Sequence, residues 1–153
     1  MTKFVIDASI ALKWVVQEEG TSQALVLLQH AKLIAPDLLV PECANILWKK
    51  VRRKELTQDE ARLAARLLQG TEIELLPTRS LLEQAARIAI ELDHPAYDCL
   101  YLALAMENGC RFVTADERFI RKLGQGPRSP YRDNVVGLLE AAGGLDEKTP
   151  KGK

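Results

Sequence analysis

The sequence predicts an α/β fold, a three-layer α/β/α sandwich with a mainly parallel central sheet. Short apolar runs that suit buried strands, such as residues 4–6 and 111–114, are separated by segments with helical periodicity. Strands separated by helices need right-handed crossovers, which give a parallel sheet covered by helices on both faces. Functional side chains in such sheets lie beyond the carboxyl ends of the strands.

The expected elements alternate along most of the chain. Residues 4–6 form a β-type run that ends at Asp7, and Pro36 ends a second run at 33–35. Weak alternation predicts a third strand at 72–76, and residues 135–136 are expected to form an edge strand. Helices are expected at residues 9–17, 22–31, 37–54, 57–68, 80–92, 95–108 and 117–123.

Several helix boundaries have a sequence signal. Ser9 suits an N-cap, Pro41 fits the third helix only in its first turn or at a break, and Gly109 supplies a left-handed stop. Residues 57–60 and 80–83 each have the pattern of a capping box. The apolar stripes expected behind these two boxes are Ala61, Ala64, Ala65 and Leu68, and Leu82, Ala85, Ala86 and Ala89.

Length and composition indicate one domain over residues 1–145 and a polar, disordered tail at 146–153. Lys plus Arg and Asp plus Glu both number 21, so overall charge favours neither nucleic acid nor a membrane, and a phosphate partner needs a local basic patch. Three cysteines without C-x-x-C spacing indicate free thiols. The early charge at Lys3 argues against a signal peptide, and no apolar run approaches the roughly 18 residues of a membrane span. We therefore expect a cytoplasmic protein without a membrane partner.

Four acidic residues are expected to meet in one cleft. Asp7 and Asp116 each follow a strand, at the carboxyl edge of the sheet. Asp98 lies in a first helical turn but shares its face with apolar residues, and Glu42 begins a helix with Asn45 one turn on, where the amide could orient the carboxylate. Each acid alone could be a cap, a dipole partner or a surface charge. Together, clustered carboxylates repel one another unless a cation or a proton holds them.

Each of the four acids stands in a short segment: residues 5–9 (VIDAS), 41–47 (PECANIL), 97–105 (YDCLYLALA) and 112–116 (FVTAD). These segments resemble the acidic motifs of PIN-domain ribonucleases, above all the VapC-type toxins of bacterial and archaeal toxin–antitoxin pairs. The resemblance covers residues 3–137. It implies an endoribonuclease that uses Mg²⁺ or Mn²⁺, with Asp7, Glu42, Asp98 and Asp116 around the metal and the hydroxyls of Ser9 and Thr114 near the site.

The chemistry of the residues agrees with this resemblance. Hard divalent cations prefer oxygen ligands, and Mg²⁺ keeps several waters when one or two carboxylates bind it. Water activated by such a cation could attack phosphorus in line, so no covalent nucleophile is needed. His30 and His94 are the only histidines, which argues against a catalytic histidine pair. His94 could reach a phosphate, but its place before Pro95 favours a residue at the start of a helix.

Basic residues must bind the RNA substrate. We expect this role for Arg118, Arg121 and Arg128, near and within a basic loop at 124–134. In the basic run at 49–54, Lys50 and Arg53 fit a solvated helix face. Trp14 and Trp48 fit the core or an interface better than base stacking. The resemblance also implies an antitoxin partner and a homodimer, with either surface on the early helices that carry Leu12, Val15, Leu25 and Leu28.

Other functions share parts of this pattern. Folds that resemble haloacid dehalogenases need a second acid two residues after the first, where this chain has Ser9. A receiver-like domain needs an aspartate at the end of its third strand, where this chain continues Leu76-Pro77-Thr78. A catalytically silent PIN-like module that binds RNA or protein remains the alternative.

Overall fold

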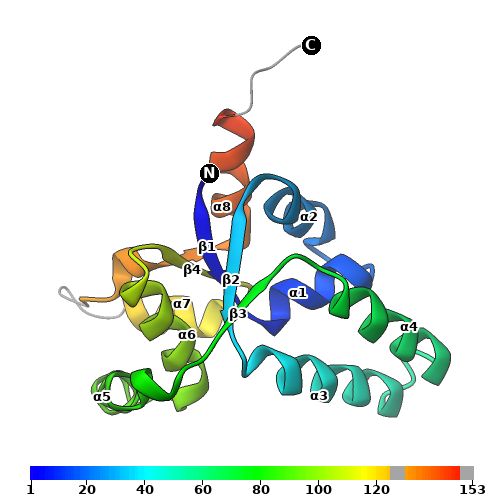
Figure 1. The fold of residues 1–153 in the computed structure, drawn as a ribbon, viewed down its shortest axis with the longest axis horizontal. Helices are drawn as coiled ribbons and strands as arrows, with labels where there is room; N and C mark the ends of the chain where they lie inside the picture. The colour runs from blue at the N-terminus through cyan, green and yellow to red at the C-terminus, as the bar shows by residue number, and fades with distance from the viewer. Residues whose placement is uncertain (125–129, 149–153) are drawn as a thin grey trace.

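The computed structural model describes residues 1–124 and 130–148, with side chains described as far as 145. Its five strands form one sheet in the order β3-β2-β1-β4-β5, and every neighbouring pair is parallel (Figure 1). The predicted α/β class with a parallel sheet is therefore confirmed. The strands are β1 (Lys3–Ile6), β2 (Lys32–Pro36), β3 (Glu74–Leu76), β4 (Arg111–Thr114) and β5 (Val135–Gly137).

Helices cover both faces of the sheet. Figure 1 shows α5, α6 and α7 on one side of the strands and α1 to α4 on the other. α6 packs on β1, β2 and β4, and α8 packs on α2. The helices are α1 (Ala8–Val15), α2 (Thr21–His30), α3 (Leu39–Arg52), α4 (Gln58–Gln69), α5 (Leu82–Leu92), α6 (Ala96–Glu107), α7 (Glu117–Gly124) and α8 (Leu138–Lys148), with short 3₁₀ turns η1 (Arg79–Leu81) and η2 (Arg132–Asn134).

β1 lies at the centre of the sheet, and its last three residues are buried. Burial on both faces explains why the strand is a continuous apolar run rather than an alternating one. Ile6 pairs with Val113 of β4, so the next residue of each strand, Asp7 and Thr114, also lie side by side. The register of two apolar strands thus sets the position of two polar side chains at the carboxyl edge.

Most of the predicted helix boundaries agree with the structure within two residues. Pro41 lies in the first turn of α3, where its missing N–H leaves no helical hydrogen bond unmade. The capping box of α4 is present, with Thr57 and Glu60 bonding each other's backbone N–H. Gly109 has φ of 62° beyond α6, as a left-handed stop requires. The predicted N-cap Ser9 was wrong, because Asp7 caps α1 by accepting from the N–H of Ile10.

The second predicted capping box was wrong. Ser80 lies inside η1, and Leu81 precedes α5 without a side-chain cap. The buried stripe is shifted accordingly: Leu82 is 71% exposed, whereas Leu81 and Ile88 are buried. Burial of these two large side chains decides the rotation of the helix, because it removes more apolar surface from water than burial of Ala86 would.

The end of the chain also differs from the expectation. α8 was not predicted, and its backbone continues to Lys148, beyond the predicted start of a disordered tail at 146. Residues 149–153 lie outside the described part of the chain. Leu138 and Leu145 of α8 are buried, and the helix covers α2. Of the residues expected on a partner surface of the early helices, Leu12 is in the core and Val15 and Leu28 pack against it, whereas Leu25 is half-buried outside that cluster. A partner surface on these helices stays a prediction.

Two further predictions concern the cysteines and the possibility of a membrane-spanning helix. Cys43, Cys99 and Cys110 are free thiols, as expected. No helix within the described residues is long and apolar enough to cross a membrane.

Candidate metal and RNA site

Asp7 lies at the centre of the candidate site, and only 6% of its surface is exposed. Its Oδ1 accepts hydrogen bonds from Ser9 Oγ at 2.5 Å and from Ile10 N at 3.2 Å, and its Oδ2 accepts from Thr114 Oγ1 at 2.6 Å. Burial raises the pKa of Asp7 to about 6, and these three hydrogen bonds limit the rise.

The hydroxyls of Ser9 and Thr114 connect the ends of β1 and β4. Ser9 Oγ also accepts from Ala115 N at 3.3 Å, and Thr114 Oγ1 accepts from Asp116 N at 3.0 Å. Each hydroxyl therefore donates to Asp7 and accepts from the backbone that leads to Asp116. The Asp7 carboxylate is thus held in place by the end of β4, the strand that leads to Asp116.

Asp98 is in the first turn of α6 and pairs with a histidine. His94 Nε2 is 2.7 Å from Asp98 Oδ2. Burial raises the pKa of Asp98, the hydrogen bond and charge of His94 lower it, and the charge of Asp116 raises it. The interpretation of Asp98 as only a helix-dipole partner is insufficient, because its surroundings include a second acid and a dedicated hydrogen-bond donor.

Asp116 follows β4 and caps α7. Its Oδ1 accepts from Arg118 N at 3.0 Å and from Phe119 N at 3.3 Å. Asp116 therefore does act as a helix cap, the structural role that the sequence allowed for it. It uses one carboxylate oxygen, and Oδ2 of Asp116 has no hydrogen-bond partner among the described residues.

Glu42 is half-buried in the first turn of α3. Burial raises the pKa of Glu42, the nearby hydroxyl of Tyr101 lowers it, and the charges of Asp7 and Asp98 raise it. Glu42 Oε1 and Tyr101 Oη are both buried and have no hydrogen-bond partner of normal geometry within the described chain. Asn45 is exposed, and Glu42 Oε1 takes no hydrogen bond from it within the described residues, so an orienting role for Asn45 stays a prediction.

The four acids form an electrostatic series. Asp116 acts on Asp98, Asp98 acts on Asp7, and Asp7 and Asp98 both act on Glu42, each raising the pKa of its neighbour. The topology predicted that these residues would meet, and they come close enough for their charges to interact. Such an arrangement favours a positive ligand, which would offset the repulsion.

The donor set suits a hydrated, hard divalent cation. No three His, Cys, Asp or Glu side chains in the described structure are arranged to enclose a metal ion. Mg²⁺ does not need such a cage, because it binds through one or two carboxylates and retains waters. The buried, unpartnered Glu42 Oε1 is an oxygen that such a ligand or its water shell would satisfy.

The basic residues lie in different settings. Arg118 and Arg121 are exposed on α7, directly after Asp116, whereas Arg128 lies outside the described residues. Lys50, from the basic run of α3, pairs with Glu18 and Glu55 and so belongs to a surface ion network. That network agrees with a solvated helix face rather than a binding surface for phosphate.

The tryptophans also have different roles. Trp14 donates from Nε1 to the carbonyl of Ala24 at 2.7 Å and ties α1 to α2, so it is structural. Trp48 is 54% exposed, and the guanidinium of Arg52 lies 5.4 Å from its ring centre.

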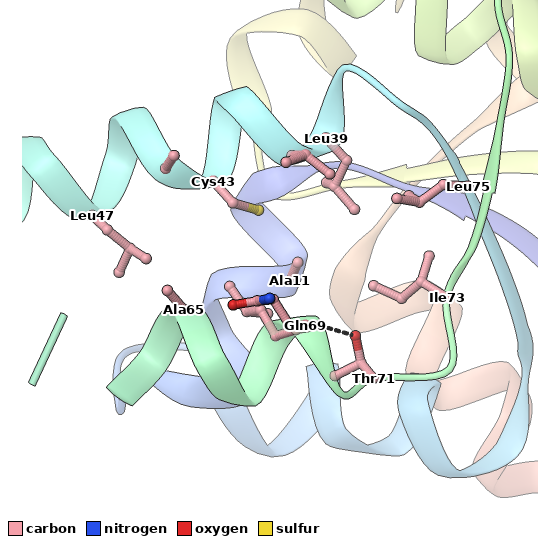
Figure 2. Close-up of a pocket in the computed structure, with 12 residues that line it drawn as sticks. Ala11, Leu39, Cys43, Leu47, Ala65, Gln69, Thr71, Ile73 and Leu75 are labelled. Carbon is pink, nitrogen blue, oxygen red and sulfur yellow. Dashed lines mark hydrogen bonds between the residues drawn. The ribbon is translucent and has the colours of Figure 1, made fainter. Parts of the chain in front are cut away.

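One cavity of the structure is separate from the acids. It has a volume of about 570 Å³ and lies between α3, α4 and the segment that leads into β3 (Figure 2). Figure 2 shows Leu47, Ala65 and Ile73 around an apolar space. None of the four acids is among its lining residues in the described structure.

Sequence reasoning missed two residues of the site. His94 was interpreted as a residue at the start of a helix, and Tyr101 only as part of an apolar face. Tyr101 lies three residues after Asp98 on the same face of α6, and that spacing was an available signal. For His94 the signal was only its nearness in sequence, four residues before Asp98 and ahead of the helix.

Comparisons with known proteins agree with this geometry. Residues 4–123 match the family model described as "PIN domain". The chain is 32% identical over 123 residues to ribonuclease VapC3 of Pyrobaculum aerophilum, an alignment that covers 78% of this chain and 94% of that protein. Ribonuclease VapC9 of Mycobacterium tuberculosis is 32% identical over 114 residues, covering 74% of this chain and 86% of its own. The crystal structure of PAE2754 from Pyrobaculum aerophilum has a TM-score of 0.73 at 20% identity, covering 96% of this chain and 97% of that chain.

Proposed function

Because this chain belongs to the PIN-domain family, we propose that it is a metal-dependent endoribonuclease that hydrolyses RNA phosphodiester bonds as the toxin of a toxin–antitoxin pair. The observation that carries the proposal is the buried Asp7, whose hydrogen-bond partners Ser9 and Thr114 also accept from the backbone that leads to Asp116. The charge of Asp98 also acts on Asp7, and the charges of both raise the pKa of Glu42. Mg²⁺ or Mn²⁺ is the cofactor that we assign, since both prefer oxygen ligands.

We assign separate roles in metal binding, orientation of Asp7 and RNA binding to the residues of the site. A bound divalent ion supplies activation of water and neutralisation of charge on the phosphate oxygens. Asp7, Asp98, Asp116 and Glu42 would hold it, and Ser9 and Thr114 orient Asp7 through their hydrogen bonds. Arg118 and Arg121 on α7 and Arg128 would bind the RNA backbone.

Cleavage of RNA by the purified full-length chain tests the proposal. Single-stranded and structured RNAs should be cut with Mg²⁺ or Mn²⁺ and left intact with EDTA. Asp98→Asn, which keeps size and removes charge, should lower cleavage at least about a hundredfold, in line with the several kcal/mol that a metal contributes. The matched control is Asp59→Asn, an exposed acid on α4. Cleavage undiminished by EDTA would reject a metal mechanism.

The alternative, a silent module, predicts a different outcome. Such a protein would bind RNA without cutting it under any metal condition. The toxin role is tested separately by expression in a bacterial host, where the wild type should arrest growth and Asp98→Asn should not. We also propose a homodimer, which sedimentation of the purified chain would establish or exclude, and a cytoplasmic location.

An antitoxin is the partner that the proposed role requires. Exposed apolar side chains stand on α3 and α4: Val40, which also lines the cavity, is 58% exposed, Leu63 55% and Leu67 53%. A protein partner that covers them would remove apolar surface from water. Val40→Asp and Leu67→Asp should then leave RNA cleavage unchanged but weaken binding of the antitoxin. Co-expression of the antitoxin should therefore no longer relieve the growth arrest that these variants cause. Relief that persists in both variants would place the antitoxin elsewhere.

A further inference from the structure

The Asp98 carboxylate has one hydrogen-bond donor among the described side chains, and it comes from outside α6. His94 precedes the helix, and its Nε2 lies 2.7 Å from Asp98 Oδ2. Both side chains are largely shielded, with 14% and 26% exposed. A carboxylate can only accept, so Nε2 carries the proton in this pair.

His94 is held from several directions. Its backbone N–H donates to the carbonyl of Ala89 at 3.1 Å, directly after Asp93 turns the chain with φ of 50°. Its ring lies 4.8 Å from the ring of Phe119, which is buried in α7. Lys122, also on α7, donates to the carbonyl of Asp93. The imidazole is therefore fixed between the helix that carries Asp98 and the helix that Asp116 caps.

This placement argues against a direct role in proton transfer. The Nε2 proton is used by Asp98, and the ring packs at a tilt of 42° against the ring of Phe119. What the pair does fix is the rotation of the Asp98 carboxyl group. Oδ2 is occupied by His94, and Oδ1 has no hydrogen-bond partner within the described residues.

We propose that His94 is a positioning residue that holds Asp98 so that its second oxygen faces the metal. The inference rests on the proposed function and deepens it. Asp98 and Asp116 repel each other, so an unrestrained Asp98 side chain would rotate away from the position needed for shared binding. Hydrogen bonds to metal-binding carboxylates commonly change metal affinity or activity about 10–100-fold.

Three substitutions separate the hydrogen bond from packing. His94→Gln keeps a side-chain N–H that can reach Asp98. His94→Phe keeps a ring against Phe119 and has no donor, and His94→Ala removes both. The matched control is His30→Gln, because His30 is exposed at the end of α2.

Calorimetric titration of each full-length variant with Mn²⁺ gives the decisive readout. We expect His94→Phe and His94→Ala to bind Mn²⁺ about 10–100-fold more weakly, and His94→Gln and His30→Gln to bind close to wild type. In cleavage assays, kcat of His94→Phe should fall at limiting Mn²⁺ and recover at saturation, while KM for RNA stays unchanged. Circular dichroism establishes that each variant is folded.

Opposite patterns overturn the inference. If His94→Phe binds Mn²⁺ like wild type, or if His94→Gln is as weak as His94→Ala, the donor does not position Asp98 and the histidine only packs. If the wild type binds Mn²⁺ and the His94 variants bind it equally well, only the positioning role of His94 is rejected, and the proposed function stands. A wild type that neither binds Mn²⁺ nor cuts RNA rejects the proposed function with it.

Discussion

Thr114 donates its hydroxyl proton to Asp7 across 2.6 Å, although 107 positions separate the two residues in the chain. The contact exists because β1 and β4 are parallel neighbours whose registered ends stop at the same edge. The same hydroxyl accepts from the backbone N–H of Asp116. One buried oxygen thus serves two acids.

Thr114→Val should destabilise the protein by about 1–3 kcal/mol, because it leaves a buried carboxylate oxygen and an N–H without a partner while preserving shape. Urea unfolding in EDTA measures the change. Thr114→Ser, which keeps the hydroxyl, is the matched control and should be destabilised much less. Equal stability of the valine variant and wild type would contradict the role assigned to this hydrogen bond.

The stability of the metal-free protein should fall as pH rises from about 4 to about 6. The pKa of Asp7 is raised from 3.8 to about 6, so in this range the folded state keeps a proton that the unfolded state releases. A difference of about two pKa units corresponds to a loss of about 3 kcal/mol, complete above pH 6. Unfolding curves in EDTA across this range, with Asp7→Asn as comparison, test the prediction; an equally steep slope in the variant would assign it to another group.

Asp98→Asn should melt at a higher temperature than wild type in EDTA. The substitution removes a charge that burial disfavours and that Asp116 repels, and the new side chain still offers an oxygen to His94. The variant should also lose most of the stabilisation that Mn²⁺ gives wild type. Thermal melts with and without Mn²⁺ decide it, since a purely structural acid would give a lower melting temperature and an unchanged response to the ion.

Arg118→Ala should weaken RNA binding and flatten its dependence on salt. Removal of one phosphate interaction with single-stranded RNA reduces the logarithmic salt slope by about 0.7. Backbone capping by Arg118 N survives the change, so α7 should remain intact. Arg62→Ala, an exposed arginine on α4, is the control. Identical affinity and slope for Arg118→Ala would place the RNA-binding surface elsewhere.

Gly20→Ala should destabilise more than Gly109→Ala. Both glycines have positive φ, 90° and 62°, which costs an L-residue about 1–2 kcal/mol. Only at Gly20 would the added Cβ also be crowded, lying 3.0 Å from Leu138 Cδ2, whereas Gly109 has open space around it. Chemical denaturation of both variants gives the comparison, and equal losses would show that Leu138 moves aside freely.

Strand positions could be predicted because they depend on local composition. A short apolar run such as Phe4-Val5-Ile6 is enough to predict a buried strand. In a parallel sheet, Asp7 and Asp116, which follow two such strands, must then lie at the same carboxyl edge. The four acids were proposed as a site for this reason, without knowledge of any distance. Ser9 does bond Asp7, but the cap expected from Ser9 belongs to Asp7, which both caps α1 and accepts from β4.

The remaining features depend on tertiary contacts that local sequence does not encode. α8 contains Gly143 and Gly144, which weaken helix propensity, and it is stabilised by packing on α2. The position of His94 against Asp98 depends on Phe119, which is remote in sequence. Asn45 has suitable spacing but lies on the exposed side of α3, which only the packed helix reveals.

The central position of β1 also determines when during synthesis the proposed site can form. A nascent chain that ends before Arg111 already contains three of the four acids, yet β1 then lacks one of its two neighbouring strands and Asp7 lacks Thr114. The proposed site is therefore incomplete until translation has passed Thr114 and β4 has docked. If the chain cuts RNA as proposed, its activity begins only after most of the domain has left the ribosome.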